Sequence, residues 1–442
     1  MPFSSVDFPV SPRKSPFFYG WVIVGVGTLG ILSSIPGQTM GVSVFTEHLM
    51  EAVGLTRMQI SIAYGAGTVC SGFLLTQGGM FIDRIGVRRM IVLATILLSL
   101  SLLMVAASGD ITNTLVRIVG ETSRIYIAMT VMFLSFFMLR FWGQGMLALT
   151  PRVMIGKWFD RRRGLAIGFA GVFVSFGFGT SPIALNLLIE RLGWQGAYYL
   201  MAGVIGIGVS LVGWAFYRER PEDCGLLPDG ASNTETHADT PGAEMRTQRD
   251  FSLAEVVRSY PFWVFTLGLS SQGIVVTAAT FHIISLSESA GITGAQGLAM
   301  FFPMSLILVT TNLTAGWLSD KTQLKYFLMV MMVMQSLGTC GLMFLGDFGG
   351  RAMFIIGFGI SGGIFGTLIG TAWPRFYGLA HLGAISGLNM SVMVMATSVG
   401  PLLFAGSLDW TGSYTTGILI CLIVPAIVFF GAFRANNPQR TL

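Results

Sequence analysis

Long apolar stretches separated by short polar segments dominate the pattern along the chain. A helix that crosses a bilayer needs about 20 mostly apolar residues, and the chain contains twelve such stretches. They cover residues 17–41, 60–81, 90–107, 126–149, 164–188, 197–217, 261–282, 298–318, 326–345, 353–373, 385–404 and 418–433. We therefore expect an all-α membrane protein with twelve transmembrane helices.

One longer polar segment divides these stretches into two sets of six. It runs from Arg218 to Tyr260 and is rich in charged residues, Pro, Gly, Ser and Thr, a composition typical of a flexible linker. We predict an N-terminal six-helix bundle over residues 1–217, a cytoplasmic linker over 218–259 and a C-terminal six-helix bundle over 260–442.

The composition excludes several classes of protein. Apolar residues make up 53% of the chain and charged residues 11%, against about 25% charged residues in soluble domains, which rules out a water-soluble fold. The net charge of +5 is too small to indicate nucleic-acid binding. The four cysteines lack the paired spacing of a metal site or a disulfide framework, and we expect no metal and no other cofactor.

The basic residues predict how the chain crosses the membrane. With the N-terminus placed in the cytoplasm, most of the 26 Lys and Arg residues fall in cytoplasmic segments, as the positive-inside rule requires. The first apolar stretch is too long for a signal-peptide core, so we expect it to be a retained helix. Both termini are therefore expected in the cytoplasm.

Matched landmarks indicate that the two halves repeat each other. The spacing from Gly79 to Asp83 after the second stretch recurs from Gly316 to Asp320 after the eighth. Further matches are Pro151-Arg152 with Pro374-Arg375, and Gly164, Gly168 and Pro182 with Gly383, Gly387 and Pro401. Secondary transporters use such a duplication to build a central site between two bundles.

Residues 79–89 resemble the loop signature of the major facilitator superfamily. The matching positions are Gly79, Asp83, Arg84, Gly86, Arg88 and Arg89. The second copy, with Gly316, Asp320 and Lys321, lacks the closing Gly-Arg-Arg. The resemblance implies two pseudo-symmetric six-helix bundles around a central cavity, which open alternately to either side of the membrane.

The resemblance also implies a gating role for these signature residues. They would latch the two halves when the cavity faces outward, with Asp83 accepting hydrogen bonds from a helix N-terminus or an arginine. Anions are favoured at helix N-termini, and charge-assisted pairs can be broken and remade between states. The alternative is a solvated cluster of positive charges at the cytoplasmic surface.

Several loop features resemble a narrower group, the bacterial monocarboxylate and oxalate/formate carriers. These features are Gln144-Gly145, Trp158-Phe159 with Arg161-Arg162-Arg163-Gly164, and Arg220-Pro221-Glu222-Asp223 with Gly225-Leu226. They imply a protein of the bacterial inner (cell) membrane, and we expect a monomer.

Arg140 is the only ionised side chain in the interior of a predicted span. It lies sixteen residues after Arg124 and twelve before Arg152, far from both membrane surfaces at about 1.5 Å per residue. Keeping a guanidinium there costs about 2.5–3.5 kcal/mol, and no Asp or Glu lies inside any predicted span. We expect a substrate anion as its partner, because the planar group binds a carboxylate or phosphate bidentately. The alternative is that Arg140 satisfies backbone carbonyls at a helix break.

Polar side chains at other span positions are weaker candidates for substrate contacts. Gln144 and Phe136 lie four residues either side of Arg140, so α-helical spacing puts all three on one face. The remaining candidates are Gln38, Gln272, Asn312, Asn389 and Thr367. An amide in a membrane helix can equally bind a neighbouring helix.

His282 closes the predicted span 261–282 at its outer end. Its ordinary pKa of about 6.5 would suit a coupling proton. The alternative is a hydrated residue at the membrane interface.

Together these features predict a secondary transporter that moves a small organic anion, with Arg140 as the counter-charge. The substrate that they favour is a monocarboxylate. A membrane enzyme would need clustered nucleophiles, metal ligands or paired carboxylates, and none are clustered within the predicted spans, so we do not expect an enzyme. The alternative within transport is efflux of drugs or other amphiphiles. Proton symport and exchange with a counter-anion both stay open.

Overall fold

Helices and short connections make up the computed structural model, which describes residues 7–230 and 249–441. These residues contain no β-strand, and this confirms the prediction of an all-α membrane protein. The chain divides into two units. Unit 1 comprises Met1–Trp158, Phe173–Gly230 and Ser386–Ser391; unit 2 comprises Phe159–Val172, Ala231–Ile385 and Val392–Leu442. Of the predicted linker, residues 231–248 lie outside the described residues, and the boundaries predicted for the two bundles stay a prediction.

Eleven helical stretches in the described residues are long and apolar enough to cross a membrane. One of them, Arg163–Phe216, has 54 residues, about 80 Å at 1.5 Å per residue and far more than a bilayer requires. Gly193 interrupts it with a φ of 71°. The break separates the predicted spans 164–188 and 197–217, so the eleven stretches account for all twelve predicted spans.

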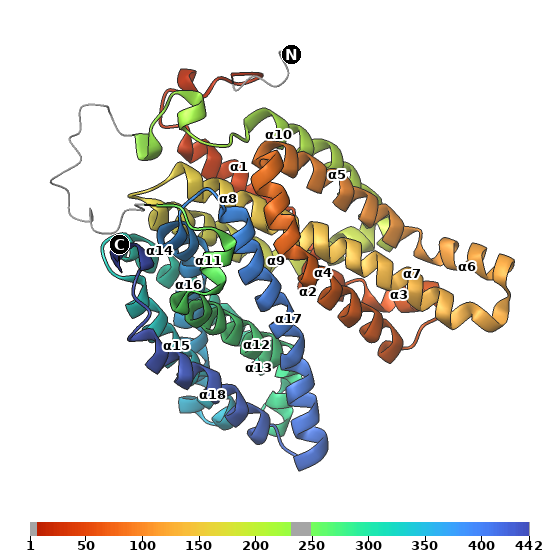
Figure 1. Ribbon diagram of the computed structural model, residues 1–442. Helices are drawn as coiled ribbons and strands as arrows, with labels where there is room; N and C mark the ends of the chain where they lie inside the picture. The colour runs from red at the N-terminus through yellow and green to blue at the C-terminus, as the bar shows by residue number, and fades with distance from the viewer. Residues whose placement is uncertain (1–6, 231–248, 442) are drawn as a thin grey trace. The chain divides into compact units, whose positions relative to one another are not determined.

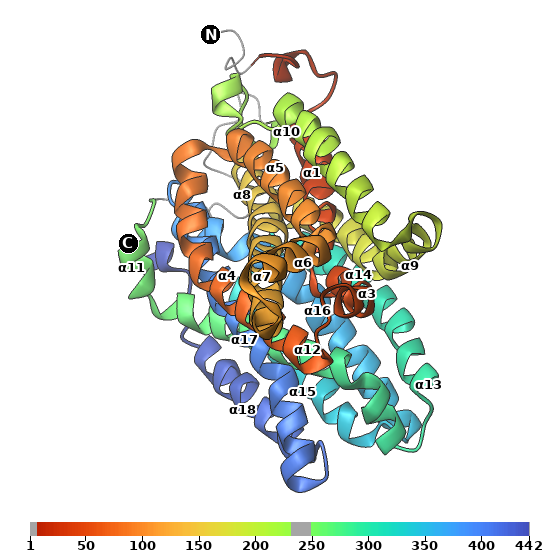
Figure 2. The same ribbon diagram turned by 90° about the vertical axis from the view of Figure 1, so that its right-hand side faces the viewer.

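Unit 1 contains the helices before the linker (Figure 1). They are α1 (Gly20–Leu32), α2 (Thr39–Ser43), α3 (Thr46–Val53), α4 (Arg57–Ile85), α5 (Val87–Ala106), α6 (Ser108–Val119), α7 (Arg124–Leu139), the π-helix η5 (Arg140–Leu147), α8 (Ala148–Trp158), most of α9 (Arg163–Gly203), the π-helix η6 (Val204–Val209) and α10 (Ser210–Phe216). Helix α4 packs against α7, α1 against α8, and α5 against α10, which lies beside it in Figures 1 and 2.

Unit 2 contains the remaining helices. They are α11 (Leu253–Val257), α12 (Tyr260–Ser289), α13 (Gly294–Ala299), α14 (Phe301–Ser319), α15 (Leu324–Gly341), α16 (Phe348–Tyr377), most of α17 (Leu382–Thr411) and α18 (Thr415–Ala432). Helix α15 packs against both α16 and α18 (Figure 2). The apolar core of unit 2 includes Phe354, Phe358 and Phe404. The outer faces of its helices are apolar as well, because a membrane protein exposes these faces to lipid instead of water.

Local signals in the sequence explain where several helices begin. Thr56 precedes α4 and accepts from the Gln59 backbone N–H at 3.3 Å, while the Gln59 side chain accepts from the Thr56 N–H at 2.9 Å. This reciprocal capping satisfies two N–H groups that a helix N-terminus leaves unpaired. The same arrangement begins α11 with Ser252 and Glu255, and α13 with Thr293 and Gln296.

The first predicted span, 17–41, is not one continuous helix. Helix α1 ends at Leu32, a 3-10 turn covers Ile35–Gly37, and α2 begins only at Thr39. Pro36 lies in this turn and has no N–H to continue an α-helix. Gln38 then takes an extended backbone with ψ of 157°, which separates the two helical segments.

The break packs against η5 at two glycines. A Cβ on Gly143 would lie 2.8 Å from the Gly37 Cα, and a Cβ on Gly37 would lie 2.6 Å from the Leu139 carbonyl oxygen. Such distances are shorter than real Cβ contacts, so a side chain at either position forces the two backbones apart. Glycine at both positions lets the two irregular segments touch.

Replacing Gly143 by Ala should therefore destabilise the protein. We expect Gly143→Ala to lower the free energy of unfolding by about 1–3 kcal/mol, the usual effect of overpacking. Gly25→Ala in α1 is the matched control, because nothing lies within 4 Å of its added Cβ; it should be neutral or stabilising by about 0.5–1 kcal/mol. Unfolding in detergent measures both, and equal stability of the two variants would contradict the packing argument.

Candidate functional site

Arg140 is the first residue of η5 and lies in the interior of unit 1. Its side chain is only 3% exposed. Nη1 donates to the Gly37 carbonyl at 3.2 Å and to the Thr39 hydroxyl at 3.3 Å. The guanidinium carbon also lies 5.2 Å from the centre of the Tyr64 ring, within range of a cation–π interaction.

The break in the first span supplies these oxygen atoms. Because the backbone at Gln38 is extended, the Gly37 carbonyl points out of the helical ladder and is available to Arg140. Thr39 follows at the start of α2, and its hydroxyl accepts from the Tyr64 hydroxyl at 3.0 Å. Arg140, Thr39 and Tyr64 thus form one network from three helices.

The neighbours of Arg140 solvate its charge without neutralising it. A carbonyl, a hydroxyl and an aromatic ring carry no negative charge at neutral pH. Both hydrogen bonds are longer than the roughly 2.7–2.9 Å typical of a guanidinium bound to a carboxylate. The Arg140 Nε has no hydrogen-bond partner among the described residues. This arrangement can accept an anion.

Arg140 and Gln144 both lie in the π-helix η5. Hydrogen bonds in a π-helix run to the fifth residue instead of the fourth, so one turn takes more than four residues and residues four apart still lie on nearly the same face. The shared face predicted for Arg140 and Gln144 stays a prediction. Phe136 precedes the π-helix and lies edge-on to Tyr64, with ring centres 5.3 Å apart.

The other predicted polar residues fall into small groups within each unit. In unit 1, Gln38 donates to the Ser34 hydroxyl at 3.0 Å, directly beside Gly37 and Thr39. Asn389 is buried, and its side-chain oxygen has no partner among the described residues. In unit 2, Gln272 of α12 donates to the Ser361 hydroxyl of α16 at 3.0 Å.

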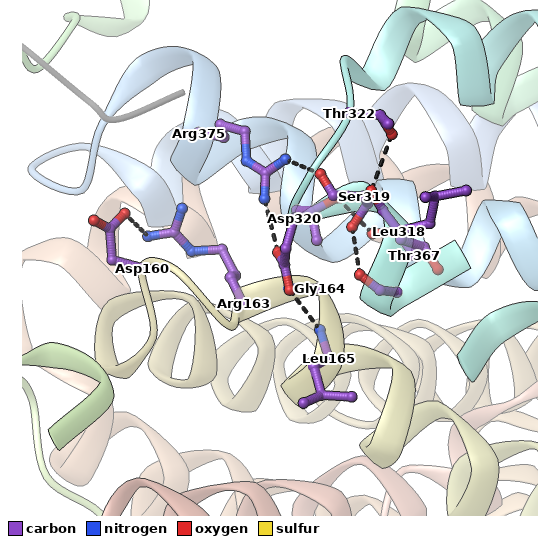
Figure 3. Close-up of polar contacts among 12 residues, drawn as sticks. Asp160, Arg163, Gly164, Leu165, Leu318, Ser319, Asp320, Thr322, Thr367 and Arg375 are labelled. Atoms are coloured by element: carbon purple, nitrogen blue, oxygen red, sulfur yellow. Dashed lines mark hydrogen bonds and ion pairs between the residues drawn. The ribbon is translucent and has the colours of Figure 1, made fainter. Parts of the chain in front are cut away.

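Asn312 and Thr367 meet in unit 2. The Thr367 hydroxyl donates to the Asn312 backbone carbonyl at 3.4 Å, and Figure 3 shows Thr367 close to the end of α14. The Asn312 amide packs against α9, where a Cβ on Gly171 would lie 2.7 Å from its oxygen. The Asn312 side chain thus lies against α9, and its predicted contact with substrate stays a prediction.

His282 does not lie at a helix end, which corrects the sequence prediction. Helix α12 continues for seven residues to Ser289. His282 Nε2 lies 3.1 Å from the Pro401 carbonyl oxygen of α17, and Nδ1 lies 3.5 Å from the Tyr414 hydroxyl. The ring is half-buried, and its contacts link α12 to α17 and to Tyr414 before α18.

A second group of polar residues surrounds Asp320 in unit 2 (Figure 3). The Asp320 carboxylate accepts from the backbone N–H groups of Gly164 at 2.9 Å and Leu165 at 3.1 Å, in the first turn of α9. Arg375 of α16 lies 2.9 Å from the same carboxylate and donates to the Ser319 carbonyl at 2.6 Å. An anion at a helix N-terminus is stabilised by unpaired N–H groups and by the helix dipole.

Burial governs the proton affinity of this carboxylate. Desolvation raises the pKa of Asp320 above its ordinary value, while the two N–H groups and the Arg375 guanidinium oppose that rise. The side chains of Arg375 and Asp320 are only 6% and 11% exposed. Protonation of Asp320 as the pH falls therefore begins at a higher pH than for a free carboxylate and weakens its pairing with Arg375.

The first signature is arranged differently. Arg88 donates to the Trp214 carbonyl at 2.7 Å, and Arg84 and Arg89 are exposed. Gly86 has a φ of 83°, so it permits the tight turn between α4 and α5. The latch role predicted for Asp83 stays a prediction. The second copy of the motif contains Gly316, Asp320 and Lys321 and lacks the closing Gly-Arg-Arg.

Sequence reasoning missed three residues that complete these groups. Tyr64 and Thr39 surround Arg140, and Arg375 pairs with Asp320. Arg375 had a signal, because it is part of the repeated Pro-Arg landmark. Tyr64 and Thr39 had none, since their contacts depend on a helix break and a π-helix that hydropathy does not reveal.

Comparison with known sequences gives consistent matches. A sequence model of the Major Facilitator Superfamily matches residues 26–401. The chain is 25% identical over 334 residues to monocarboxylate transporter 12 of Rattus norvegicus, covering 67% of this chain and 65% of that protein. It is 22% identical over 417 residues to monocarboxylate transporter 4 of Rattus norvegicus, covering 90% and 78%. The chain thus spans less than two thirds of the length of the monocarboxylate transporter 12 relatives.

Solved structures share the fold. The fucose:proton symporter of E. coli matches with a TM-score of 0.63 at 13% identity, covering 94% of this chain and 98% of that chain. A human organic anion transporter matches with a TM-score of 0.59 at 16% identity, covering 95% and 100%. These likenesses confirm the predicted two-bundle fold class and carry no information on substrate.

Removing the charge of Asp320 should destabilise unit 2. We expect Asp320→Asn to lower the free energy of unfolding by about 3 kcal/mol, because the buried Arg375 guanidinium loses its counter-charge. Asp347→Asn is the matched control, since Asp347 is exposed and makes no side-chain cap of α16. Thermal unfolding in detergent checks the difference, and an unchanged Asp320→Asn variant would show that the pair is dispensable.

Proposed function

Because the chain belongs to the Major Facilitator Superfamily, we propose that it is a secondary transporter that moves a small organic anion by alternating access. The preferred substrate is a monocarboxylate, and Arg140 is its counter-charge. The names of the curated relatives, monocarboxylate transporters 12 and 4, support this substrate class.

One observation carries the proposal: the Arg140 guanidinium is buried and has no acidic neighbour among the described residues. A substrate carboxylate would replace two long hydrogen bonds to neutral oxygens by two short charge-assisted ones. The Tyr64 ring would stay against the guanidinium and keep its plane oriented. A single cation suits a single carboxylate, because a second carboxylate would be left without a partner.

The remaining polar residues are proposed as secondary contacts. Gln38 and Gln144 adjoin the Arg140 region in unit 1, where Gln38 is hydrogen-bonded within its own segment. Gln272, Asn312 and Asn389 each retain a side-chain oxygen without a partner among the described residues. Thr367 offers a hydroxyl. These groups could accept or donate hydrogen bonds to the uncharged part of a substrate.

The signature residues are proposed to control the conformational change. Asp320 with Arg375 and the first turn of α9 supports a latch in which a carboxylate holds a helix N-terminus. Gly79, Asp83, Arg84, Gly86, Arg88 and Arg89 would serve the corresponding function in the first copy. Breaking and remaking such contacts accompanies rigid-body motion in transporters.

We also propose the organisation inferred from the sequence. The bundles would comprise residues 1–217 and 260–442, joined by a cytoplasmic linker over 218–259. The chain would act as a monomer in the bacterial inner membrane with both termini in the cytoplasm. Transport would be driven by proton symport or by exchange for a counter-anion.

Replacing Arg140 should abolish transport of the substrate anion. Arg140→Gln and Arg140→Ala remove the charge, and Arg140→Lys removes the planar pair of donors; we expect each to reduce uptake at least 100-fold, about 2.7 kcal/mol in transition-state terms. Proteoliposome uptake of a panel of carboxylates, with matched neutral amides, measures the effect. Arg117→Gln is the control, because Arg117 is exposed.

Two outcomes would contradict this assignment. Normal carboxylate uptake by a folded Arg140→Ala protein would exclude Arg140 as the counter-charge. Uptake of the neutral amides at the rate of the carboxylates would instead favour the alternative of amphiphile efflux.

His282 should affect packing more than proton coupling. Its ring nitrogens lie 3.1 Å from the Pro401 carbonyl oxygen and 3.5 Å from the Tyr414 hydroxyl, which itself donates to the Ser285 hydroxyl, so the ring takes part in contacts between helices. We therefore expect His282→Gln to keep the wild-type dependence of uptake on a pH gradient while lowering thermal stability. A selective loss of the pH-gradient response, with anion exchange intact, would assign the coupling proton to His282.

A further inference from the structure

An open pocket lies in unit 2 beside the turn between α14 and α15. Its lining comprises Thr322, Gln323, Leu324, Lys325, Arg375, Phe376, Ala435 and Asn437. The substrate proposal uses none of this space. The lining contains two cations, three uncharged polar side chains and no acidic residue.

The two cations differ in how their charges are satisfied. Arg375 is paired with Asp320 and the Ser319 carbonyl. Lys325 donates to the neutral Asn436 side-chain oxygen at 2.7 Å and makes no ion pair among the described residues. Lys321, three residues before α15, likewise makes no described ion pair and is exposed. The pocket therefore keeps net positive charge that an anion would balance.

The pocket lies at a membrane boundary. Residues 320–323 connect the spans that end at Ser319 and begin at Leu324. Trp317 and Tyr326 flank this connection, 51% and 53% exposed. The Lys321 ammonium lies 3.6 Å from the Trp317 ring centre, and the Lys325 ammonium 5.5 Å from the Tyr326 ring centre. Exposed Trp and Tyr at span ends lie at the level of lipid headgroups.

We propose that this pocket binds the phosphate headgroup of an anionic phospholipid. Lys325 is the principal cation, Lys321 adds charge at the rim, and the amides of Gln323 and Asn437 can donate to phosphate oxygens. The exposed Trp317 and Tyr326 rings provide apolar contact for the glycerol and upper acyl chain. Those rings favour a lipid over a free phosphate ion. Lys325 makes no ion pair among the described residues, and its free positive charge favours an anionic lipid over a zwitterionic one.

Lipid retention by the purified full-length protein tests the proposal. The protein is titrated with phosphatidylglycerol or phosphatidylcholine, and bound lipids are counted by native mass spectrometry. We expect one phosphatidylglycerol to bind more tightly than the rest, and Lys325→Gln to weaken it about fivefold, as expected for one interfacial lysine. Lys325→Arg should retain it. Lys14→Gln, which removes an exposed lysine in unit 1, is the matched control and should not change it.

Each other outcome overturns the proposal. Equal retention of phosphatidylglycerol by wild type and Lys325→Gln would mean that no specific headgroup site exists at Lys325. Equal affinity for phosphatidylcholine would exclude charge recognition. Displacement of the lipid by millimolar inorganic phosphate would identify a site for free anions. The thermal unfolding temperature of Lys325→Gln without added lipid should equal that of wild type, which separates loss of binding from loss of folding.

Discussion

A guanidinium buried in an apolar helix bundle, with no acidic neighbour in the part of the chain that the structure describes, is the constraint on which this structure depends. Its burial costs about 2.5–3.5 kcal/mol, and the local backbone is arranged around it. The first span breaks at Pro36, the fourth becomes a π-helix at Arg140, and Gly37 and Gly143 let the two irregular segments touch. Irregular backbone inside a membrane is tolerated only where it is buried in protein or lines a polar cavity.

Two of the buried arginines, Arg140 and Arg375, differ in how their charges are satisfied. Arg375 is held by Asp320 at 2.9 Å, and its charge is balanced inside unit 2. Within residues 7–230 and 249–441, Arg140 donates two hydrogen bonds, at 3.2 and 3.3 Å, both to neutral oxygens. Breaking the pair of Arg375 and Asp320 would leave a buried ion without a counter-charge. An anion bound to Arg140 would instead supply a counter-charge. The same side chain is therefore balanced by a carboxylate in one place and, within the described part of the chain, only by neutral groups in the other.

Hydropathy predicted the helical class and the number of spans, because crossing a bilayer demands length and apolar composition that are readable in any 20-residue window. The helical stretch of 54 residues follows the same rule, because the break at Gly193 divides it into two segments that are each long enough to cross a bilayer. The charge of Arg140 was also visible, because an ionised residue stands out in an apolar run. Its neighbours were not. Tyr64 and Thr39 reach Arg140 through a helix break and a π-helix, which have no periodic signal.

The degenerate second signature shows why motif completeness is a poor guide to chemistry. It lacks the Gly-Arg-Arg ending, yet Asp320 has two backbone N–H partners and a guanidinium. These partners come from α9 and α16, so the carboxylate needs no cations supplied by its own loop. The contact between Asp320 and α9 requires only that Asp320 follows Gly316 at a fixed spacing. Gly316 and Gly164 approach each other closely, and this brings the first turn of α9 within hydrogen-bonding distance of the Asp320 carboxylate. The spacing from glycine to aspartate, which both copies share, is the part of the motif that the contacts of Asp320 use.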